Sequence, residues 1–185
     1  MSSAYSAFAH QGVRMEPYAI RSVADREGNL LYESRPQPRE ALRADTSFLL
    51  AYLLRGVVER GTAQAAKALN WPVAGKTGTM DDYTDAWFIG FDADVTVGVW
   101  VGYDEKRSLG YGETGASAAL PIWMDVMRSY LSRRPDRDNP PVLEAPGNIV
   151  FVTMPNGQTE AFISGTQPSS GASRTEGVPP ADVVP

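Results

Sequence analysis

Cysteine is absent from the sequence, and histidine occurs once, as His10. A chain without cysteine has no disulfide framework and no thiolate metal site, and one histidine cannot build a histidine cluster, so any metal site would consist of carboxylates alone. Basic residues are also few, because 17 lysines and arginines face 22 aspartates and glutamates, a formal charge of -5. An acidic chain lacks a broad electrostatic attraction for nucleic acid or anionic membranes. We therefore expect no metal, no other cofactor and no nucleic-acid partner.

Long hydrophobic runs are missing as well. Nowhere do 18 apolar residues follow one another, and the first residues, MSSAYSAFAHQGV, lack the positive charge and the apolar run of a secretory signal. The sequence therefore predicts no membrane segment and a chain that is soluble as given. The 185 residues, of which 43% are apolar, suffice for the core of one ordinary domain.

The first part of the chain mixes helical and strand-like periodicity. Apolar residues at helical spacing predict a short helix over 2–9 and a longer one that starts near Ser47, with Asp45 or Thr46 as its N-cap. One or two further helical turns are expected over 62–69. Between the two helices, the segment YAIRSVADREGNLLYES predicts a β-hairpin that turns at REGN, and RPQPRE predicts a Pro-broken connection.

From residue 73 the period of the apolar residues changes to two. Short segments rich in Val, Thr, Ile, Phe and Trp, separated by turns that contain Asp and Gly, predict three sequential antiparallel strands over 73–79, 86–92 and 95–102. The segment GETGASAALPIWMDVMRSYLSRR then predicts an amphipathic helix that lies on the sheet. The expected fold class is α/β (α+β), an antiparallel sheet covered by a C-terminal helix.

The end of the chain differs in composition from the rest. We expect residues 1–133 to form the folded portion of a domain, and residues 134–165 to form a linker and a short C-terminal strand at IVFVTM. Residues 166–185 are enriched in Gly, Ser and Pro, which predicts a disordered tail.

The segment GKTGT admits two interpretations. A phosphate-binding loop has the pattern GxxxxGK[ST], but Asn70 stands where the first glycine belongs, Pro72 removes an amide, and aspartates follow Lys76. If residues 73–79 are a strand, Lys76 and Gly78 share one face and the two threonines share the other. A lysine beside an accessible strand suits a ligand with a carboxylate. A bare KTG tripeptide is also compatible with an ordinary exposed lysine.

Longer segments reduce this ambiguity. GKTGT, DYTDAWFIGFDADVTVGVWVGYD and SLGYGETGASAALPIW resemble the end of the transpeptidase domain of class A penicillin-binding proteins. YLLRGVVERGTAQAAKAL and EAFISGTQP are also similar to that family, particularly to its 1A type. The resemblance runs from about residue 4 to residue 168 and implies a β-lactamase/transpeptidase-like fold, present here as a partial domain.

The resemblance also implies roles for four residues. Lys76 would polarise a serine of the family's second motif and attract the substrate carboxylate, which the hydroxyls of Thr77 and Thr79 would bind. The N–H of Thr79 would be an oxyanion donor, and Gly78 would keep the strand open to the ligand. The implied catalytic residues are thus Lys76 and Thr79, and the implied substrate-binding residues are Thr77, Gly78 and Thr79. The implied partners are D-Ala-D-Ala stem peptides and β-lactams, at the periplasmic face of the inner membrane in a full-length parent.

The sequence departs from the family pattern in one important respect. No serine is followed by lysine three positions later, and none is followed by asparagine two positions later, so the SxxK and SxN motifs are absent. We therefore expect the C-terminal part of a longer cell-wall enzyme, inactive alone because it lacks the nucleophile. A noncatalytic module that binds peptide carboxylates is the alternative. Without the missing half, we expect one apolar face of the sheet to be exposed and the stability to be marginal.

Overall fold

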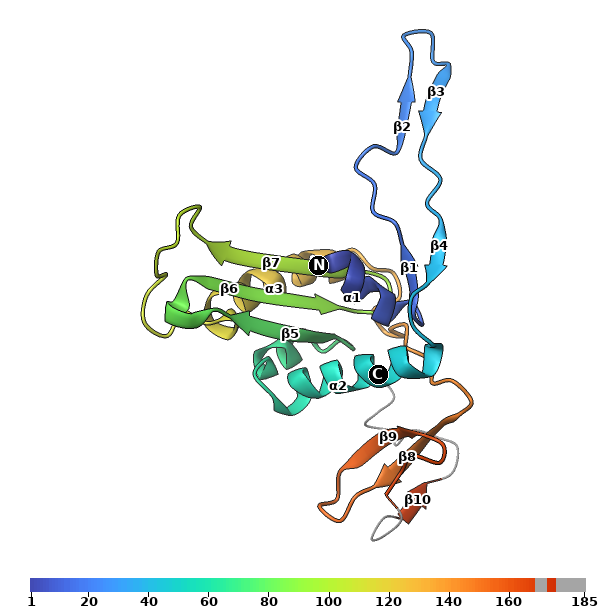
Figure 1. Cartoon of the computed structure of the whole chain (residues 1–185), viewed down its shortest axis with the longest axis vertical. Helices are drawn as coiled ribbons and strands as arrows, with labels where there is room; N and C mark the ends of the chain where they lie inside the picture. Colours follow the sequence, from blue (N-terminus) through green and yellow to red (C-terminus); the bar gives the residue numbers. More distant parts are fainter. Residues whose placement is uncertain (169–172, 176–185) are drawn as a thin grey trace.

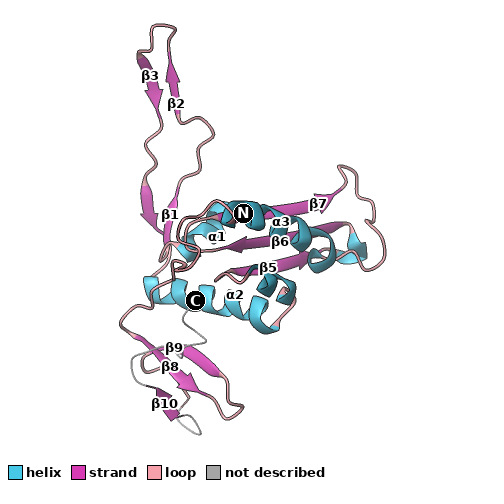
Figure 2. Cartoon of the chain, turned by 180° about the vertical axis from the view of Figure 1, so that it is seen from behind, coloured by secondary structure: helices cyan, strands magenta, loops and turns pink. Residues whose placement is uncertain are grey.

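The computed structural model describes residues 1–168 and the backbone of residues 173–175. Its body is a three-stranded antiparallel sheet flanked by helices, and an arm and a small second sheet extend from opposite sides of that body (Figure 1, Figure 2). The main sheet has the order β5-β6-β7 and consists of β5 (Ala74–Thr79), β6 (Asp85–Phe91) and β7 (Thr96–Gly102). The three predicted strands and their antiparallel pairing are confirmed.

One face of the main sheet is covered by α3 (Leu120–Leu131), which follows a π-helical turn, η3 (Gly115–Ala119). Trp123 of α3 and Phe88 of β6 are fully buried, and their ring centroids lie 4.9 Å apart. The short 3-10 helix η1 (Gln64–Leu69) contributes to the same core. The predicted amphipathic helix therefore covers the sheet as expected.

The opposite face is covered at one end only. There α1 (Ser2–Ala9) lies against β6 and β7, and Ile89 on this face is buried. Trp100, farther along the same face, is 43% exposed. The expectation that only the C-terminal helix covers the sheet is wrong, because α1 covers one end of the second face. The expectation of exposed apolar side chains holds for Trp100 but not for Ile89.

The second long helix, α2 (Ala44–Arg60), packs beside β5 and against α1. It begins three residues before the predicted start, its N-cap is Arg43, and neither Asp45 nor Thr46 caps it. The buried carboxylate of Asp45 instead accepts hydrogen bonds from Arg43 Nε (3.1 Å) and from Asn148 Nδ2 (2.7 Å). The cap prediction was wrong because this carboxylate binds partners on both sides of the helix start.

Residues 13–40 form an arm built from two paired segments (Figure 1). Near the body, β1 (Val13–Met15) pairs with β4 (Pro38–Glu40), and farther out β2 (Ser22–Ala24) pairs with β3 (Leu30–Glu33). The predicted hairpin is confirmed. The predicted Pro-broken connection is partly a strand, because the proline stands at the first position of β4, where a missing N–H is tolerated.

The second sheet has the order β10-β8-β9 and consists of β8 (Ile149–Thr153), β9 (Thr159–Ile163) and β10 (Ser173–Thr175). The predicted last strand corresponds to β8. Strand β9 was not predicted from the sequence, although Gly157, with φ of 80°, supplies a turn between β8 and β9. β10 falls in the tail that the sequence predicts to be disordered. The remainder of that prediction lies outside the described residues, at 169–172 and 176–185.

The segment between the two sheets packs on the body. Arg134 forms an ion pair with Asp94 (2.5 Å), and Leu143 packs against the buried cluster of Ala51, Ala74 and Phe91. The proposed boundaries at 133 and 165 stay predictions. Within the described part of the chain, no helix is long and apolar enough to cross a membrane.

Replacement of Asp45 by asparagine should lower the melting temperature at about pH 7. Hydrogen bonds from Arg43, and then from Asn148, hold the pKa of the Asp45 carboxyl below its ordinary value. A depressed folded pKa stabilises the fold above the unfolded value, near pH 4, and that stabilisation is lost as the pH falls through the folded pKa. Melting followed by circular dichroism should therefore show a difference between Asp45→Asn and the unchanged chain that shrinks towards about pH 3.

The control for this prediction is Asp125→Asn, because the Asp125 side chain is 75% exposed and forms an ion pair with Arg128 on the same helix. An exposed pair of this kind contributes little to stability. Equal melting shifts for the two variants would contradict the structural role of Asp45.

Gly90→Ala should destabilise the fold by overpacking the core. A Cβ at this position would lie 2.7 Å from Trp123 Cζ2 and 2.8 Å from Phe88 Cε1. Overpacking of this kind typically costs about 1–3 kcal/mol. Gly147→Ala is the matched control, because a Cβ there would have no neighbour within 4 Å. Urea unfolding should give a lower midpoint for Gly90→Ala than for Gly147→Ala. Equal midpoints would show that the core accommodates the extra methyl group without loss of stability.

Candidate functional site

The candidate site is the free edge of β5. In the described part of the chain β5 pairs with β6 alone, with Lys76 opposite Ile89 and Gly78 opposite Trp87. The N–H of Met80 donates to the carbonyl of Asp85 (3.0 Å), which continues the ladder by one pair. In an antiparallel ladder, hydrogen-bonded and non-hydrogen-bonded pairs alternate. The backbone N–H and C=O groups of the two threonines, Thr77 and Thr79, therefore point away from β6 and towards the free edge.

Side chains along β5 alternate between the two faces of the sheet. Lys76 and Gly78 share the face of Trp87 and Trp100, whereas both threonines lie on the face that α3 covers. This division between the faces agrees with the prediction from the sequence. The free edge thus has a cation on one side and two hydroxyls on the other.

Lys76 is exposed, and its Nζ donates a hydrogen bond to the carbonyl of Thr77 at 3.0 Å. This bond draws the ammonium towards the edge, because the Thr77 carbonyl points there. Among the residues that the structure describes, the Lys76 ammonium makes no hydrogen bond to a hydroxyl or carboxylate. The ammonium is therefore accessible to an anion that approaches along the edge.

The two threonine hydroxyls form hydrogen bonds with two different segments of the chain. The hydroxyl of Thr77 lies 2.8 Å from that of Thr62, which follows α2. The Oγ1 of Thr79 accepts a hydrogen bond from the backbone N–H of Gly115 at 3.0 Å. Both threonines of the strand were predicted from the sequence, but Thr62 and Gly115 were not, because their types carry no local signal for this contact.

Gly78 lies where another backbone comes close. A Cβ on Gly115 would be 2.7 Å from the carbonyl oxygen of Gly78 and 2.3 Å from that of Trp87. On the other face, a Cβ on Gly78 itself would meet only the Trp87 side chain, at 3.1 Å. The backbone that approaches Gly78 is thus a segment of the same chain, and it lies on the face opposite Lys76.

The end of the strand is ordered by a turn and two aromatic pairs. The 3-10 turn η2 (Asp81–Tyr83) joins β5 to β6, and the Tyr83 ring packs against Tyr111 at 5.7 Å. On the open face, Trp100 stacks near Trp87 at 6.2 Å and donates from Nε1 to Asp85 Oδ1 (2.8 Å). These contacts hold the turn between β5 and β6, and the open face beside it, in place.

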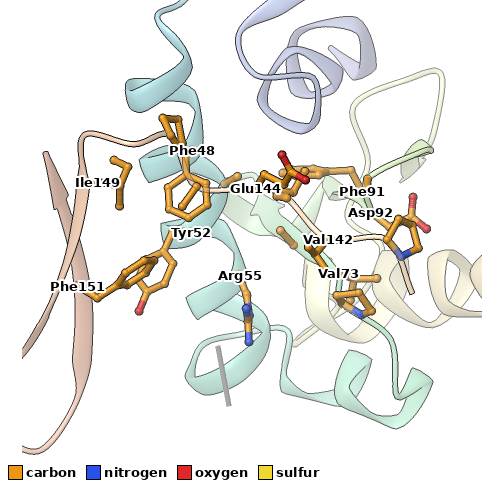
Figure 3. A pocket seen from close by; sticks show the side chains of 18 of the residues that line it. Phe48, Tyr52, Arg55, Val73, Phe91, Asp92, Val142, Glu144, Ile149 and Phe151 are labelled. Carbon is orange, nitrogen blue, oxygen red and sulfur yellow. The ribbon is translucent and has the colours of Figure 1, made fainter. Parts of the chain in front are cut away.

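A separate cavity of about 510 Å³ lies between α2, the start of β5 and the second sheet (Figure 3). Phe48, Tyr52 and Phe151 form an aromatic wall on one side. The carboxylate of Asp92 at the opposite side accepts hydrogen bonds from Trp71 Nε1 (2.9 Å) and from the Val95 N–H (2.7 Å), and so has a structural role. This cavity does not include the residues of the candidate site. The described residues contain no cluster of three or more histidine or carboxylate side chains suited to a metal ion.

Comparisons with known proteins identify the family of this chain. The family model of the penicillin binding protein transpeptidase domain matches residues 1–128. Penicillin-binding protein 1A of Aquifex aeolicus is 39% identical over 178 residues, which are 91% of this chain and 24% of that protein. The crystal structure of penicillin-binding protein 1A from Haemophilus influenzae superposes with a TM-score of 0.81 at 26% identity, over 91% of this chain and 32% of that one. Penicillin-binding protein A from M. tuberculosis, solved as an imipenem acyl-enzyme complex, gives a TM-score of 0.57 at 25% identity, over 70% of this chain and 30% of that one.

These matches define the class of the protein. The fold is that of penicillin-binding transpeptidase domains, mixed α and β with antiparallel sheets. The chain belongs to the penicillin-binding protein transpeptidase family and is similar to the 1A type of class A. It spans about a quarter of the length of the A. aeolicus relative and about a third of the H. influenzae structure.

Proposed function

We propose that this chain is the part of a peptidoglycan D,D-transpeptidase that holds the substrate carboxylate, and that it cannot carry out the reaction alone. One observation carries the proposal: the free edge of β5 presents the Lys76 ammonium, two threonine hydroxyls and two outward backbone N–H groups within a single short strand. Cationic groups and convergent donors bind carboxylates strongly because these hydrogen bonds are charge-assisted.

The proposed substrate is a stem peptide that ends in D-Ala-D-Ala. Its terminal carboxylate accepts hydrogen bonds from the hydroxyls of Thr77 and Thr79 and is attracted by Lys76. The scissile carbonyl oxygen accepts from the N–H of Thr79, which points to the free edge. A preorganised donor of this kind stabilises the oxyanion of the transition state and typically contributes about 10²–10³ in rate.

The nucleophile has to come from outside this sequence. No serine here has a lysine three positions later, and no hydroxyl is hydrogen-bonded to Lys76 in the described residues. In the complete enzyme, Lys76 would polarise a serine supplied by the remainder of the domain. That serine would attack the D-Ala-D-Ala carbonyl, release D-alanine, and pass the acyl group to the amine of a neighbouring stem peptide.

The relatives support β-lactams as ligands of the complete enzyme. The M. tuberculosis protein was solved as an acyl-enzyme complex with imipenem, a covalent adduct of a family member. A β-lactam carries a carboxylate beside its reactive carbonyl, the same arrangement as D-Ala-D-Ala. We propose the cell envelope, at the periplasmic face of the inner membrane, as the place where the complete enzyme acts.

The alternative is a noncatalytic module that uses the same edge to bind peptide carboxylates. One observation favours this alternative: the described residues of this chain form the edge by themselves, without the part of the domain that would carry the nucleophile. The two proposals agree on binding and differ on acylation. An experiment that joins this chain to a segment containing the nucleophile distinguishes the two proposals.

Incubated with a fluorescent penicillin, the 185-residue chain should acquire no covalent label. A chimera should be labelled if it carries residues 1–185 in place of the matching segment of A. aeolicus penicillin-binding protein 1A. In that chimera, Lys76→Ala should slow acylation by about tenfold to a hundredfold, the range for losing a hydrogen bond to a charged group. Fluorescence of denatured protein on a gel measures the covalent label.

The control in the chimera is Lys106→Ala, because Lys106 is an exposed lysine in the loop after β7. Labelling of the chain by itself would reveal a nucleophile within the sequence and refute the proposed incompleteness. A folded chimera that binds peptide but is never labelled would favour the noncatalytic module.

N-acetyl-D-Ala-D-Ala should bind the 185-residue chain by itself. In an NMR titration of the ¹⁵N-labelled chain, the backbone amides of Thr77 and Thr79 should shift, because their N–H groups face the ligand. The same peptide with a C-terminal amide is the matched control and should cause no shifts, since it lacks the carboxylate. Shifts confined to the residues around the separate cavity would place the ligand elsewhere and contradict the proposed site.

A further inference from the structure

The connection from β7 to α3 passes round the end of the sheet where β5 ends and β6 begins (Figure 1). It is fixed there by the N–H of Leu109, which donates to the carbonyl of Tyr83 at 2.8 Å. A few residues later the chain reaches Gly115, whose Cα lies directly against the backbone of the Gly78–Trp87 pair. The start of η3 therefore forms the support behind the end of the candidate binding edge.

The bond between Gly115 and Thr79 decides which way the threonine hydroxyl can donate. A hydroxyl has one donor hydrogen and two acceptor lone pairs. The Gly115 N–H occupies one lone pair of Thr79 Oγ1 at 3.0 Å. The hydroxyl hydrogen is left for a different partner, and Thr79 is exposed. The bond from Gly115 thus orients Thr79 as a donor towards an anion.

The segment that carries Gly115 is itself fixed by a capping box. The Thr114 N–H donates to Ser117 Oγ (2.7 Å), and the Ser117 N–H donates to Thr114 Oγ1 (3.3 Å). Ser117 Oγ also donates to the carbonyl of Gly112 at 2.9 Å. These three bonds hold the backbone on both sides of Gly115, so the direction of its N–H is set before any ligand arrives.

We propose that Gly115 is a positioning residue for carboxylate binding, acting through its N–H on the hydroxyl of Thr79. This inference rests on the proposed function and adds a residue that does not touch the substrate. Glycine is required because a Cβ would lie 2.3 Å from the Trp87 carbonyl oxygen and 2.7 Å from that of Gly78. Both obstacles are backbone atoms of a paired ladder, which cannot move aside as a flexible side chain can.

The test measures the dissociation constant of N-acetyl-D-Ala-D-Ala for the full 185-residue chain by NMR titration. Four proteins are compared: the unchanged chain, Gly115→Ala, Thr79→Val and the double variant. Gly115→Ala should weaken binding about tenfold, and Thr79→Val should weaken it about tenfold to a hundredfold. The double variant should bind no more weakly than Thr79→Val, because without the hydroxyl there is nothing left to orient.

Gly90→Ala is the control for a loss of stability, since it also places a Cβ against packed atoms but lies away from Thr79. Ser117→Ala is a milder second variant that loosens the capping box while leaving Gly115 in place. It should weaken binding by less than Gly115→Ala, and again only when the Thr79 hydroxyl is present. Ser117→Ala decides the matter if Gly115→Ala fails to fold.

Each result has a distinct meaning. An unchanged affinity in Thr79→Val, or no binding by the unchanged chain, would refute the proposed function itself. If Thr79→Val weakens binding as expected but the losses from Gly115→Ala and Thr79→Val add up in the double variant, the positioning role is refuted and the proposed function is not. The positioning role would also be refuted if neither Gly115→Ala nor Ser117→Ala weakened binding more than Gly90→Ala does.

Discussion

The one-sided pairing of β5 is the constraint on which the site depends. Because β5 pairs with β6 and, in the described residues, with no second strand, alternate backbone groups of β5 are hydrogen-bonded inside the sheet and the others point to the free edge. The same alternation separates the ammonium of Lys76 from the two threonine hydroxyls. A second neighbour along β5 would occupy the outward N–H groups and abolish the site. The chemistry of the edge is therefore a consequence of sheet topology rather than of any single residue.

An unpaired strand edge is a risk for the protein, and a charged residue on β5 reduces that risk. Unpaired strand edges promote association between chains, and a charged residue on the edge reduces that tendency. Lys76 meets this need, but Trp100 on the same face is 43% exposed. The other face is better covered, since Phe88 packs against Trp123 of α3 and both side chains are fully buried. The sheet is thus well packed on the face that α3 covers and only partly covered on the opposite face.

Local periodicity predicted the elements that carry the site, and the resemblance predicted its residues. The alternating segments at 73–79 and 86–92 gave β5 and β6 within one residue of their observed bounds. Contacts between distant segments could not be obtained in this way. The Thr79–Gly115 bond spans 36 residues, and Asp45 meets Asn148 across 103 residues, so neither leaves a periodic trace. The sequence predicts Asp45 as a cap because nothing near it in the chain signals its remote partner, Asn148.

The segment around Gly115 shows how one stretch of sequence can satisfy a local and a distant requirement together. Thr114 and Ser117 are explained locally, because their reciprocal bonds cap the start of η3. The glycine between them is not explained by the cap, since a larger residue there would be compatible with a helix start. Only the backbone of Gly78 and Trp87, in contact with it, requires the absence of a Cβ. The missing Cβ of Gly115 therefore sets how closely η3 can approach the strand. That distance determines whether the Gly115 N–H can reach Thr79 at all.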